Sequence, residues 1–241
     1  LETLRELVSI DSGSRDIEGL NRIAAVIATR LRTLGGDVEV RSPSADVTRF
    51  EDTPEQIGPM VEARFRGTGS VNILLLAHMD TVYEQGMGAA QPFRIDGNRA
   101  YGLGIADDKH GVALILHTVA MLNTLDFRDY GTLTVLINGD EEISSPGSRS
   151  RIEQLGREHD VIFSCEGSGS EDRVRLATSG NGDVLLRVTG RASHAGSAPE
   201  QGRNALYELA HQIMQMRDLS DLDVGLKMNW TVARAGTVRN I

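Results

Sequence analysis

The chain has 241 residues, of which 40% are hydrophobic and 24% charged, and its formal net charge at pH 7 is −9. The acidic balance argues against a nucleic-acid partner, because nucleic-acid binding needs clustered lysine and arginine. No apolar stretch approaches the ~20 residues that span a bilayer, so we expect a soluble protein of one large or two small domains that does not enter a membrane.

Two helices are predicted at the start of the chain. Leucine and valine residues at helical spacing indicate a helix over 1–9. A second helix over 17–34 has its apolar residues along one face. We expect Asp16 to be its N-cap and Gly35-Gly36 to end it.

From residue 37 onward, β-rich runs alternate with helical patterns. The predicted strands are 37–41, 61–66, 72–77, 132–138 and 161–165, the predicted helices are 108–123 and 146–157, and a hairpin is expected at Asp96-Gly97. The runs 72–77, 133–137 and 161–163 lack polar alternation, which is typical of strands buried on both faces of a parallel sheet. Helix 108–123 is apolar nearly all round, so we expect it to be buried too. The alternation predicts an α/β fold with a mostly parallel sheet flanked by helices.

The pattern changes near residue 180, after a glycine-rich stretch that resembles a hinge. Partial alternation over 183–189 and weaker alternation over 226–234 indicate strands, with a helix over 202–217 between them. This predicts a second, antiparallel α+β domain. We therefore expect a first domain over 1–179 and the start of a second over 180–241.

Polar clusters recur beside the predicted buried strands. They are His78-Met79-Asp80, Asp107-Asp108, Glu141-Glu142 and Glu166. Three of them follow a strand, and ligands of open α/β sheets bind beyond the carboxyl ends of the strands. One imidazole and several carboxylates suit one or two divalent metal ions. A tandem pair of glutamates allows one to hold metal while the other stays free as a general base.

Each cluster alone has a simpler explanation. A histidine at a strand end can be purely structural, acidic residues at a helix start can be caps, and a loop carboxylate can be solvated. Asp80, however, lies two residues from His78 and therefore points the same way along a strand, where it can accept the second ring N–H. The recurrence of all four clusters favours a metal site.

Several segments resemble the di-zinc family of aminoacylases and carboxypeptidases, and most of all its bacterial glutamate carboxypeptidases that hydrolyse folates. These segments are LLLAHMDTV, YGLGIADDKHG, TVLINGDEE, GRASHAGSAPEQGRNAL and NWTVARAGTVRNI. The resemblance covers most of the chain and implies two zinc ions per full-length subunit, although cobalt or manganese would tolerate the same ligands. By this resemblance His78 and Glu166 hold one ion, Asp107 bridges both, and Glu142 holds the second.

The resemblance also implies roles for the remaining site residues. Asp80 would orient His78, Glu141 would be the general acid/base, and the peptide after Asp107 would be cis. The second domain would be a lid and the interface of a homodimer. From it, His194 would reach the partner's active site to stabilise the tetrahedral intermediate, and Asn240 would contact the substrate.

The implied activity is hydrolysis of an amide bond next to a free carboxylate, releasing C-terminal glutamate from peptides or folate-like substrates. An N-acyl-amino-acid deacylase or dipeptidase on the same scaffold is the first alternative, and a non-catalytic, metal-stabilised binding protein is the second. The resemblance places a second-zinc histidine and a carboxylate-binding arginine beyond Ile241, so we expect residues 1–241 alone to be inactive and marginally folded. The compartment is left open between bacterial cytoplasm and periplasm.

Overall fold

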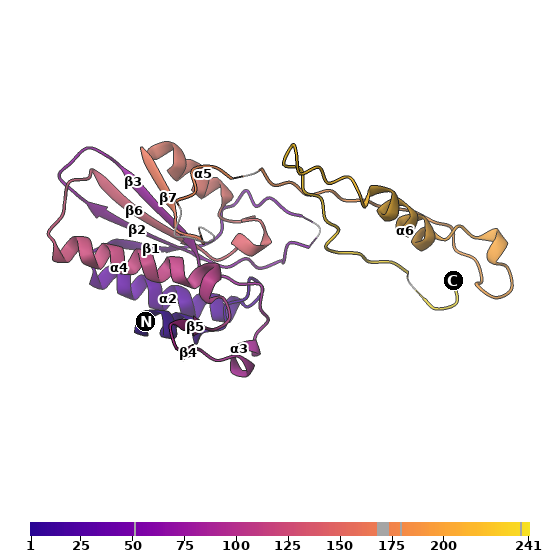
Figure 1. Cartoon of the computed structure of the whole chain (residues 1–241), viewed down its shortest axis with the longest axis horizontal. Helices are drawn as coiled ribbons and strands as arrows, with labels where there is room; N and C mark the ends of the chain where they lie inside the picture. The colour runs from indigo at the N-terminus through magenta and orange to yellow at the C-terminus, as the bar shows by residue number, and fades with distance from the viewer. Residues whose placement is uncertain (51, 168–173, 179, 237) are drawn as a thin grey trace. The chain divides into compact units, whose positions relative to one another are not determined.

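Figure 1 shows the computed structural model, which describes residues 1–50, 52–167, 174–178, 180–236 and 238–241. The chain divides into two compact units, Leu1–Arg173 and Val174–Ile241. We predicted a domain boundary directly after residue 179, and this residue lies outside the described ones. The assignment of the two domains to catalysis and to a lid or dimer interface stays a prediction.

The two N-terminal helices form where they are predicted. α1 spans Glu2–Val8 and α2 spans Ile17–Thr33. Asp16 caps α2, because its Oδ1 accepts a 2.9 Å hydrogen bond from the backbone N–H of Gly19, a contribution of about 1 kcal/mol. Gly35 follows the helix with a φ of 86°, a left-handed conformation that glycine adopts at little cost.

A mixed five-stranded sheet forms the centre of the first unit. Its strands are β1 (Asp37–Arg41), β2 (Met60–Arg66), β3 (Ile73–His78), β6 (Thr132–Asn138) and β7 (Val161–Ser164). They lie in the order β1-β2-β6-β3-β7. β6, β3 and β7 are parallel, whereas the pairs β1–β2 and β2–β6 are antiparallel. The parallel part is therefore the part that carries the polar clusters at its carboxyl ends.

Helices cover both faces of this sheet (Figure 1). α2 and α4 (His110–Thr124) pack on the face that presents Val61 and Val135. α5 (Arg149–Glu158) packs on the opposite face, where its Leu155 contacts a small cluster with Leu74 and Leu136. Neighbouring residues of β6 thus point to opposite faces, as the pleat of a strand requires.

Two predicted burial patterns are wrong. Val161, Ile162 and Phe163 of β7 are exposed, because this strand lies at the edge of the sheet in the described part of the chain. α4 is buried only toward the sheet, and Leu114 and Met121 on its outer face are exposed. Both runs are apolar, yet each has exposed residues. Their burial therefore depends on which neighbouring elements cover them and not on their composition alone.

Short elements connect β3 to α4. They are α3 (Met87–Ala90), β4 (Arg94–Asp96), β5 (Arg99–Tyr101) and the turn η1 (Ile105–Lys109). β4 and β5 pair as the predicted hairpin, which turns at Gly97 with a φ of 57°. The regular helix α4 begins at His110 rather than at Asp108, because Asp107 and Asp108 do not have helical backbone angles.

The second unit contains the predicted helix but not the predicted strands. α6 spans Ala205–Met216, after the turn η3 (Pro199–Gln201). No strand forms over 183–189 or 226–234, and the described residues of this unit hold only isolated bridges. A strand needs a hydrogen-bonded neighbour and a face to bury, and no described residue of this unit is buried.

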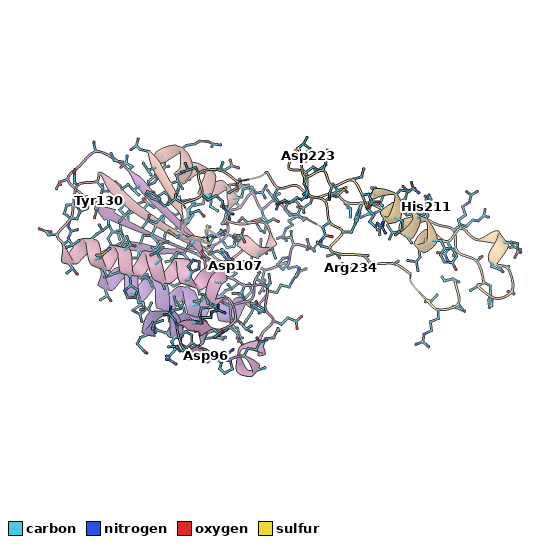
Figure 2. All side chains as sticks on the ribbon, in the orientation of Figure 1. Asp96, Asp107, Tyr130, His211, Asp223 and Arg234 are labelled. Atoms are coloured by element: carbon cyan, nitrogen blue, oxygen red, sulfur yellow. The ribbon has the colours of Figure 1, made fainter. Side chains whose placement is uncertain are left out.

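Figure 2 shows Asp107 and Tyr130 toward opposite ends of the strands of the first unit. Tyr130 is buried shortly before β6 begins, whereas Asp107 lies near the carboxyl ends of the parallel strands. In the part of the chain that the structure describes, no helix is both long and apolar enough to cross a bilayer.

Candidate metal centre

His78 is the last residue of β3 and is almost fully buried. Its Nδ1 lies 3.1 Å from the main-chain oxygen of Asp80 and 3.3 Å from Asp80 Oδ1. Both neighbours are acceptors, so the neutral ring carries its hydrogen on Nδ1 and leaves a lone pair on Nε2. Nε2 faces Asp107, whose Oδ1 lies 3.0 Å away.

Asp107 and Asp108 lie in turn η1 and differ in their surroundings. Their peptide bond is cis, as the resemblance implies. The side chain of Asp107 is 71% exposed and faces His78. Asp108 is fully buried and accepts hydrogen bonds from the backbone N–H groups of His78 (3.3 Å) and Gly111 (3.2 Å). Asp107 is thus available to a ligand, while Asp108 ties the end of β3 to the start of α4.

Glu141 and Glu142 lie in the turn η2 (Glu141–Ile143), directly after β6. Their backbone N–H groups donate hydrogen bonds of 3.1 Å to Asp80, to Oδ1 and Oδ2 respectively. Because β3 and β6 are adjacent and parallel, the turn after one strand reaches the residues that end the other.

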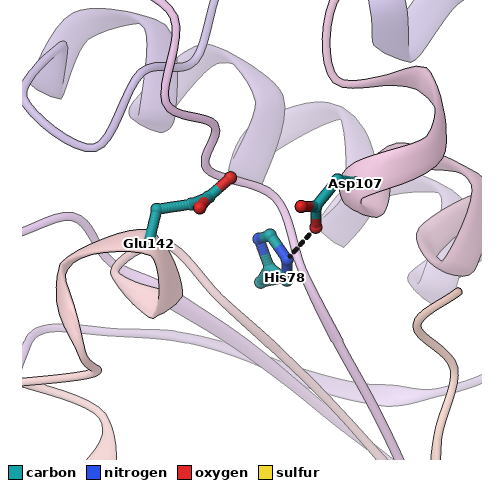
Figure 3. A group of neighbouring side chains, drawn as sticks. All are labelled: His78, Asp107 and Glu142. Carbon is teal, nitrogen blue, oxygen red and sulfur yellow. Dashed lines mark hydrogen bonds and ion pairs between the residues drawn. The ribbon is translucent and has the colours of Figure 1, made fainter. Parts of the chain in front are cut away.

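Three potential ligands come together here: His78, Asp107 and Glu142 each offer one atom within 4.8 Å of the other two. Figure 3 shows the carboxylates of Glu142 and Asp107 reaching the His78 ring from different turns. Ligand atoms about 2 Å from a tetrahedral zinc ion lie roughly 3.3 Å apart. The three atoms are therefore close enough to serve one ion, or two neighbouring ions that share Asp107. One imidazole and two carboxylates fit zinc, and cobalt or manganese also accept such ligands.

Two further carboxylates lie beside this group. Glu141 Oε2 is 3.9 Å from His78 Nε2. Among the described residues, Glu166 does not fall within the group of three. It follows β7 after one residue, and its negative charge helps to raise the pKa values of Asp108 and Glu141. Glu166 is therefore close enough to act on the centre electrostatically.

The other predicted site residues, His194 and Asn240, lie in the second unit. The backbone N–H of Ala195, next to His194, donates a 2.9 Å hydrogen bond to the main-chain oxygen of Asn240. His194 Nδ1 accepts hydrogen bonds of 3.1 Å from the backbone N–H groups of Gly196 and Ser197. In the neutral ring the hydrogen is therefore on Nε2, where it can be donated.

Comparison with known proteins identifies the family. The profile of peptidase family M20/M25/M40 matches residues 74–233, which contain every polar cluster described above. The chain belongs to this family. A member of the family is expected to depend on metal, in agreement with the ligands gathered at the end of β3.

Two relatives and one solved structure show how similar this chain is to known proteins. Carboxypeptidase G2 from Pseudomonas sp. (strain RS-16) is 43% identical over 242 residues, covering 100% of this chain and 56% of the relative. Acetylornithine deacetylase from Klebsiella pneumoniae (strain 342) is 30% identical, covering 91% of this chain and 56% of the relative. A tripeptidase structure from Staphylococcus aureus superposes with a TM-score of 0.59 at 20% identity, covering 89% of this chain and 55% of that chain. The chain thus spans little more than half the length of the relatives it matches.

The ionisable groups of this M20 centre shift one another's pKa values. Burial and the charge of Asp107 raise the pKa of Glu142 to about 7. Burial also raises the pKa of Glu141, although His78 opposes this. Burial acts to lower the pKa of His78, but the hydrogen bond and charge of Asp80 outweigh it and raise the pKa to about 10. A divalent cation would replace the His78 proton and offset the repulsion between the carboxylates.

Sequence reasoning missed three buried side chains that support the M20 centre. Lys109 Nζ donates a 2.6 Å hydrogen bond to the main-chain oxygen of Ile10, 99 residues away, and burial lowers its pKa to about 8. Ser14 Oγ donates to Asp80 Oδ2, 66 residues away. Asp140 accepts hydrogen bonds from Asn138, Gly147 and Ser148, which fixes the loop after β6. The first two contacts join distant segments, so no local pattern could have predicted them.

Proposed function

We propose that the complete protein is a metal-dependent hydrolase of amide bonds next to a free carboxylate, and that it releases C-terminal glutamate from peptides or folate-like substrates. The observation that carries this proposal is the division between two adjacent glutamates. Glu142 belongs to the group of potential ligands, while the Glu141 carboxylate lies beside it, 3.9 Å from His78 Nε2. A protein that merely binds a metal has no need of such a free carboxylate. The 43% identity to Carboxypeptidase G2 supports cleavage of a bond next to a free carboxylate.

We assign two zinc ions to each complete subunit. His78 and Glu166 would hold one ion, Asp107 would bridge the two, and Glu142 would hold the second. When bound, the metal polarises the amide carbonyl and lowers the pKa of water. The imidazole nitrogen and carboxylate oxygens of these residues also suit cobalt and manganese.

The proton transfers fall to Glu141. Its carboxylate would take a proton from the attacking water and give it to the leaving amine, as a general base and then a general acid. Burial raises the pKa of Glu141 above its ordinary 4.5, a direction that suits a group that must both accept and donate a proton. Asp80 would keep the His78 ring in the tautomer that leaves Nε2 free.

The second unit would supply the remaining contacts. The hydrogen on His194 Nε2 would be donated to the oxyanion of the tetrahedral intermediate. Asn240 would contact the substrate, and the unit as a whole would form the interface of a homodimer. In that arrangement His194 serves the active site of the partner subunit.

A substrate panel tests this proposal on the full-length, zinc-loaded protein. We expect hydrolysis of α- and γ-linked C-terminal glutamyl substrates, loss of activity with a chelator, and recovery when zinc is returned. Matched substrates that end in a glutamate amide instead of a free carboxylate should react poorly. Equal rates on the two series would contradict the proposed role of the carboxylate.

The second candidate is an N-acyl-amino-acid deacylase or dipeptidase. The 30% identity to acetylornithine deacetylase favours it. The same panel separates the two, because a deacylase would prefer acetylated amino acids over glutamyl peptides. If the metal-loaded protein hydrolyses none of these compounds, both enzymatic proposals fail and a non-catalytic, metal-stabilised binding protein becomes the favoured function.

A further inference from the structure

The segment between α1 and α2 is held against the chain that leaves β3. Gly13 and Thr81 form a parallel bridge, the Thr81 N–H donates to Ser12 O (2.9 Å), and the Ser14 N–H donates to Thr81 O (3.1 Å). A Cβ on Gly13 would lie 2.2 Å from the main-chain oxygen of Tyr83, so the approach is as close as glycine allows. Ser14 is thereby placed beside Asp80 with its backbone fixed.

The buried carboxylate of Asp80 contacts both the His78 ring and the Glu141–Glu142 turn. Its Oδ1 faces the Glu141 N–H at 3.1 Å and His78 Nδ1 at 3.3 Å. Its Oδ2 accepts from the Glu142 N–H at 3.1 Å and from Ser14 Oγ at 2.8 Å. The side chain of Asp80 has no exposed surface. A rotation of this carboxylate would therefore move the His78 ring and the Glu141–Glu142 turn relative to each other.

Among the residues that the structure describes, Ser14 is the one donor to Asp80 that lies outside those assigned to metal or proton transfer. Its hydroxyl is buried, and its other acceptor, Thr81 O, is farther away at 3.4 Å. The hydroxyl hydrogen is therefore directed at Asp80, with which it makes the shortest of the four contacts. A charge-assisted hydrogen bond of this kind is stronger than one between neutral groups and fixes the plane of the carboxylate.

We propose that Ser14 is a positioning residue of the metal centre, which sets the orientation of Asp80 and, through it, the spacing between His78 and the Glu141–Glu142 turn. This inference rests on the function proposed above. Removing a direct hydrogen-bond partner of a metal ligand commonly changes metal affinity or activity by about 10- to 100-fold. Ser14 acts one contact further away, through Asp80, so we expect an effect at the lower end of this range.

Ser12 offers a matched control. It lies two residues away, is buried like Ser14, and donates from its hydroxyl to a main-chain oxygen, that of Met79, at 2.7 Å. Ser14→Ala and Ser12→Ala each remove one buried hydroxyl from the same segment. Only the first removes a donor to Asp80.

The test compares wild type, Ser14→Ala, Ser12→Ala and Ser14→Thr in the full-length protein. Zinc affinity is measured by competition with a chromogenic chelator, site geometry by the visible absorption of the Co²⁺-substituted protein, and turnover by kcat and KM. For Ser14→Ala we expect about 10-fold weaker zinc binding, an altered Co²⁺ spectrum and a lower kcat with little change in KM. Ser14→Thr, which keeps the hydroxyl, should recover most of each property, and Ser12→Ala should match wild type in all three.

Equal effects of Ser14→Ala and Ser12→Ala on zinc affinity and on the Co²⁺ spectrum would overturn the proposal. Should Ser14→Ala fail to fold, Ser14→Cys replaces it, because a thiol has nearly the same shape but is a weak donor. Failure of the proposed function has a different signature, in which the wild type hydrolyses no substrate of the panel. The zinc and Co²⁺ measurements then still decide the role of Ser14.

Discussion

In the turn after β6, two adjacent glutamates have different neighbours, and substitution should separate their roles. Glu142 lies within the group of potential ligands and is assigned to the second ion, so Glu142→Gln should retain about one zinc ion per subunit instead of about two. Glu141→Gln should keep its zinc while turnover falls by about 10²- to 10⁴-fold, the usual contribution of general acid–base catalysis. Metal content by atomic emission and hydrolysis of the preferred substrate would be measured on the same samples.

Glu153→Gln is the control for these two variants. Glu153 lies on the exposed side of α5 and pairs with Arg157, at 3.1 Å, so its replacement should change neither zinc content nor turnover. The opposite pattern, in which Glu141→Gln loses zinc and retains activity, would exchange the roles of Glu141 and Glu142.

The protonation of His78 makes metal binding dependent on pH. In the metal-free centre the pKa of His78 is raised to about 10 and that of Glu142 to about 7. At pH 7 the ring therefore carries a proton that must leave before Nε2 can bind zinc, so binding should release at least about one proton and strengthen as pH rises. Calorimetric titration of zinc in buffers with different heats of ionisation measures this number. Zinc affinity independent of pH between 6 and 8 would contradict it.

The elements that the sequence predicts well are those whose signals are local. The Asp16 cap, the glycines after α2 and the unbroken apolar runs of β3 and β6 each lie within a few residues of the feature they specify. The exposed edge strand β7 and the missing strands of the second unit depend instead on partners elsewhere in the chain. An apolar or alternating run indicates what a segment can bury, and only the neighbouring elements decide whether it does.

The same distinction applies to the metal centre. The rule that ligands gather at the carboxyl ends of parallel strands accounts for His78 and Glu142, and Asp107, which follows no parallel strand, lies close to both. Their role as metal ligands stays a prediction. The contacts that support them, such as Ser14 with Asp80, join segments far apart in the sequence. In the sequence, a supporting residue such as Ser14 looks like any other serine in a loop, because nothing near it indicates its distant partner.

On the α5 face of the sheet, a buried carboxylate joins three elements. Glu62 of β2 lies 2.8 Å from Arg41 Nε of β1, 3.1 Å from Arg64 Nε and 2.6 Å from an Arg151 nitrogen of α5. We expect Glu62→Gln to lower the free energy of unfolding by about 3 kcal/mol. This is the lower end of the range for breaking a buried pair, because two of the arginines are partly exposed. Chemical denaturation of the full-length protein measures the change.

The pH dependence of stability provides a second measurement of this network. Burial acts to raise the pKa of Glu62, but Arg151 and the other arginines outweigh it and lower the pKa below its ordinary 4.5. The stabilisation is therefore fully present above pH 4.5 and is lost as pH falls through the lowered value. Glu62→Gln should lack this loss. Glu158→Gln is the control, since its 3.7 Å pair with Arg64 is exposed and should contribute less than about 1 kcal/mol.

At the scale of the whole molecule, the proposed mechanism draws on both units. Glu141 belongs to the first unit and His194 to the second. If His194 serves the partner subunit, a dimer that combines one Glu141→Gln subunit with one His194→Ala subunit contains one complete site. That site takes Glu141 from one chain and His194 from the other. If His194 serves its own subunit, both sites of the same dimer lack an essential group.

Mixing the two inactive full-length variants therefore distinguishes the two arrangements. After subunit exchange at equal concentrations, half of the dimers are mixed and each has one of two sites intact, so we expect about a quarter of wild-type activity for a symmetric dimer. The control mixes Glu141→Gln with a double variant carrying Glu141→Gln and His194→Ala, which should stay inactive in either arrangement. No recovery of activity in the first mixture, with exchange verified by mass spectrometry of differently tagged chains, would place His194 in its own subunit's site. Recovery would show that dimerisation completes the active site, because the histidine and the general base then belong to different chains.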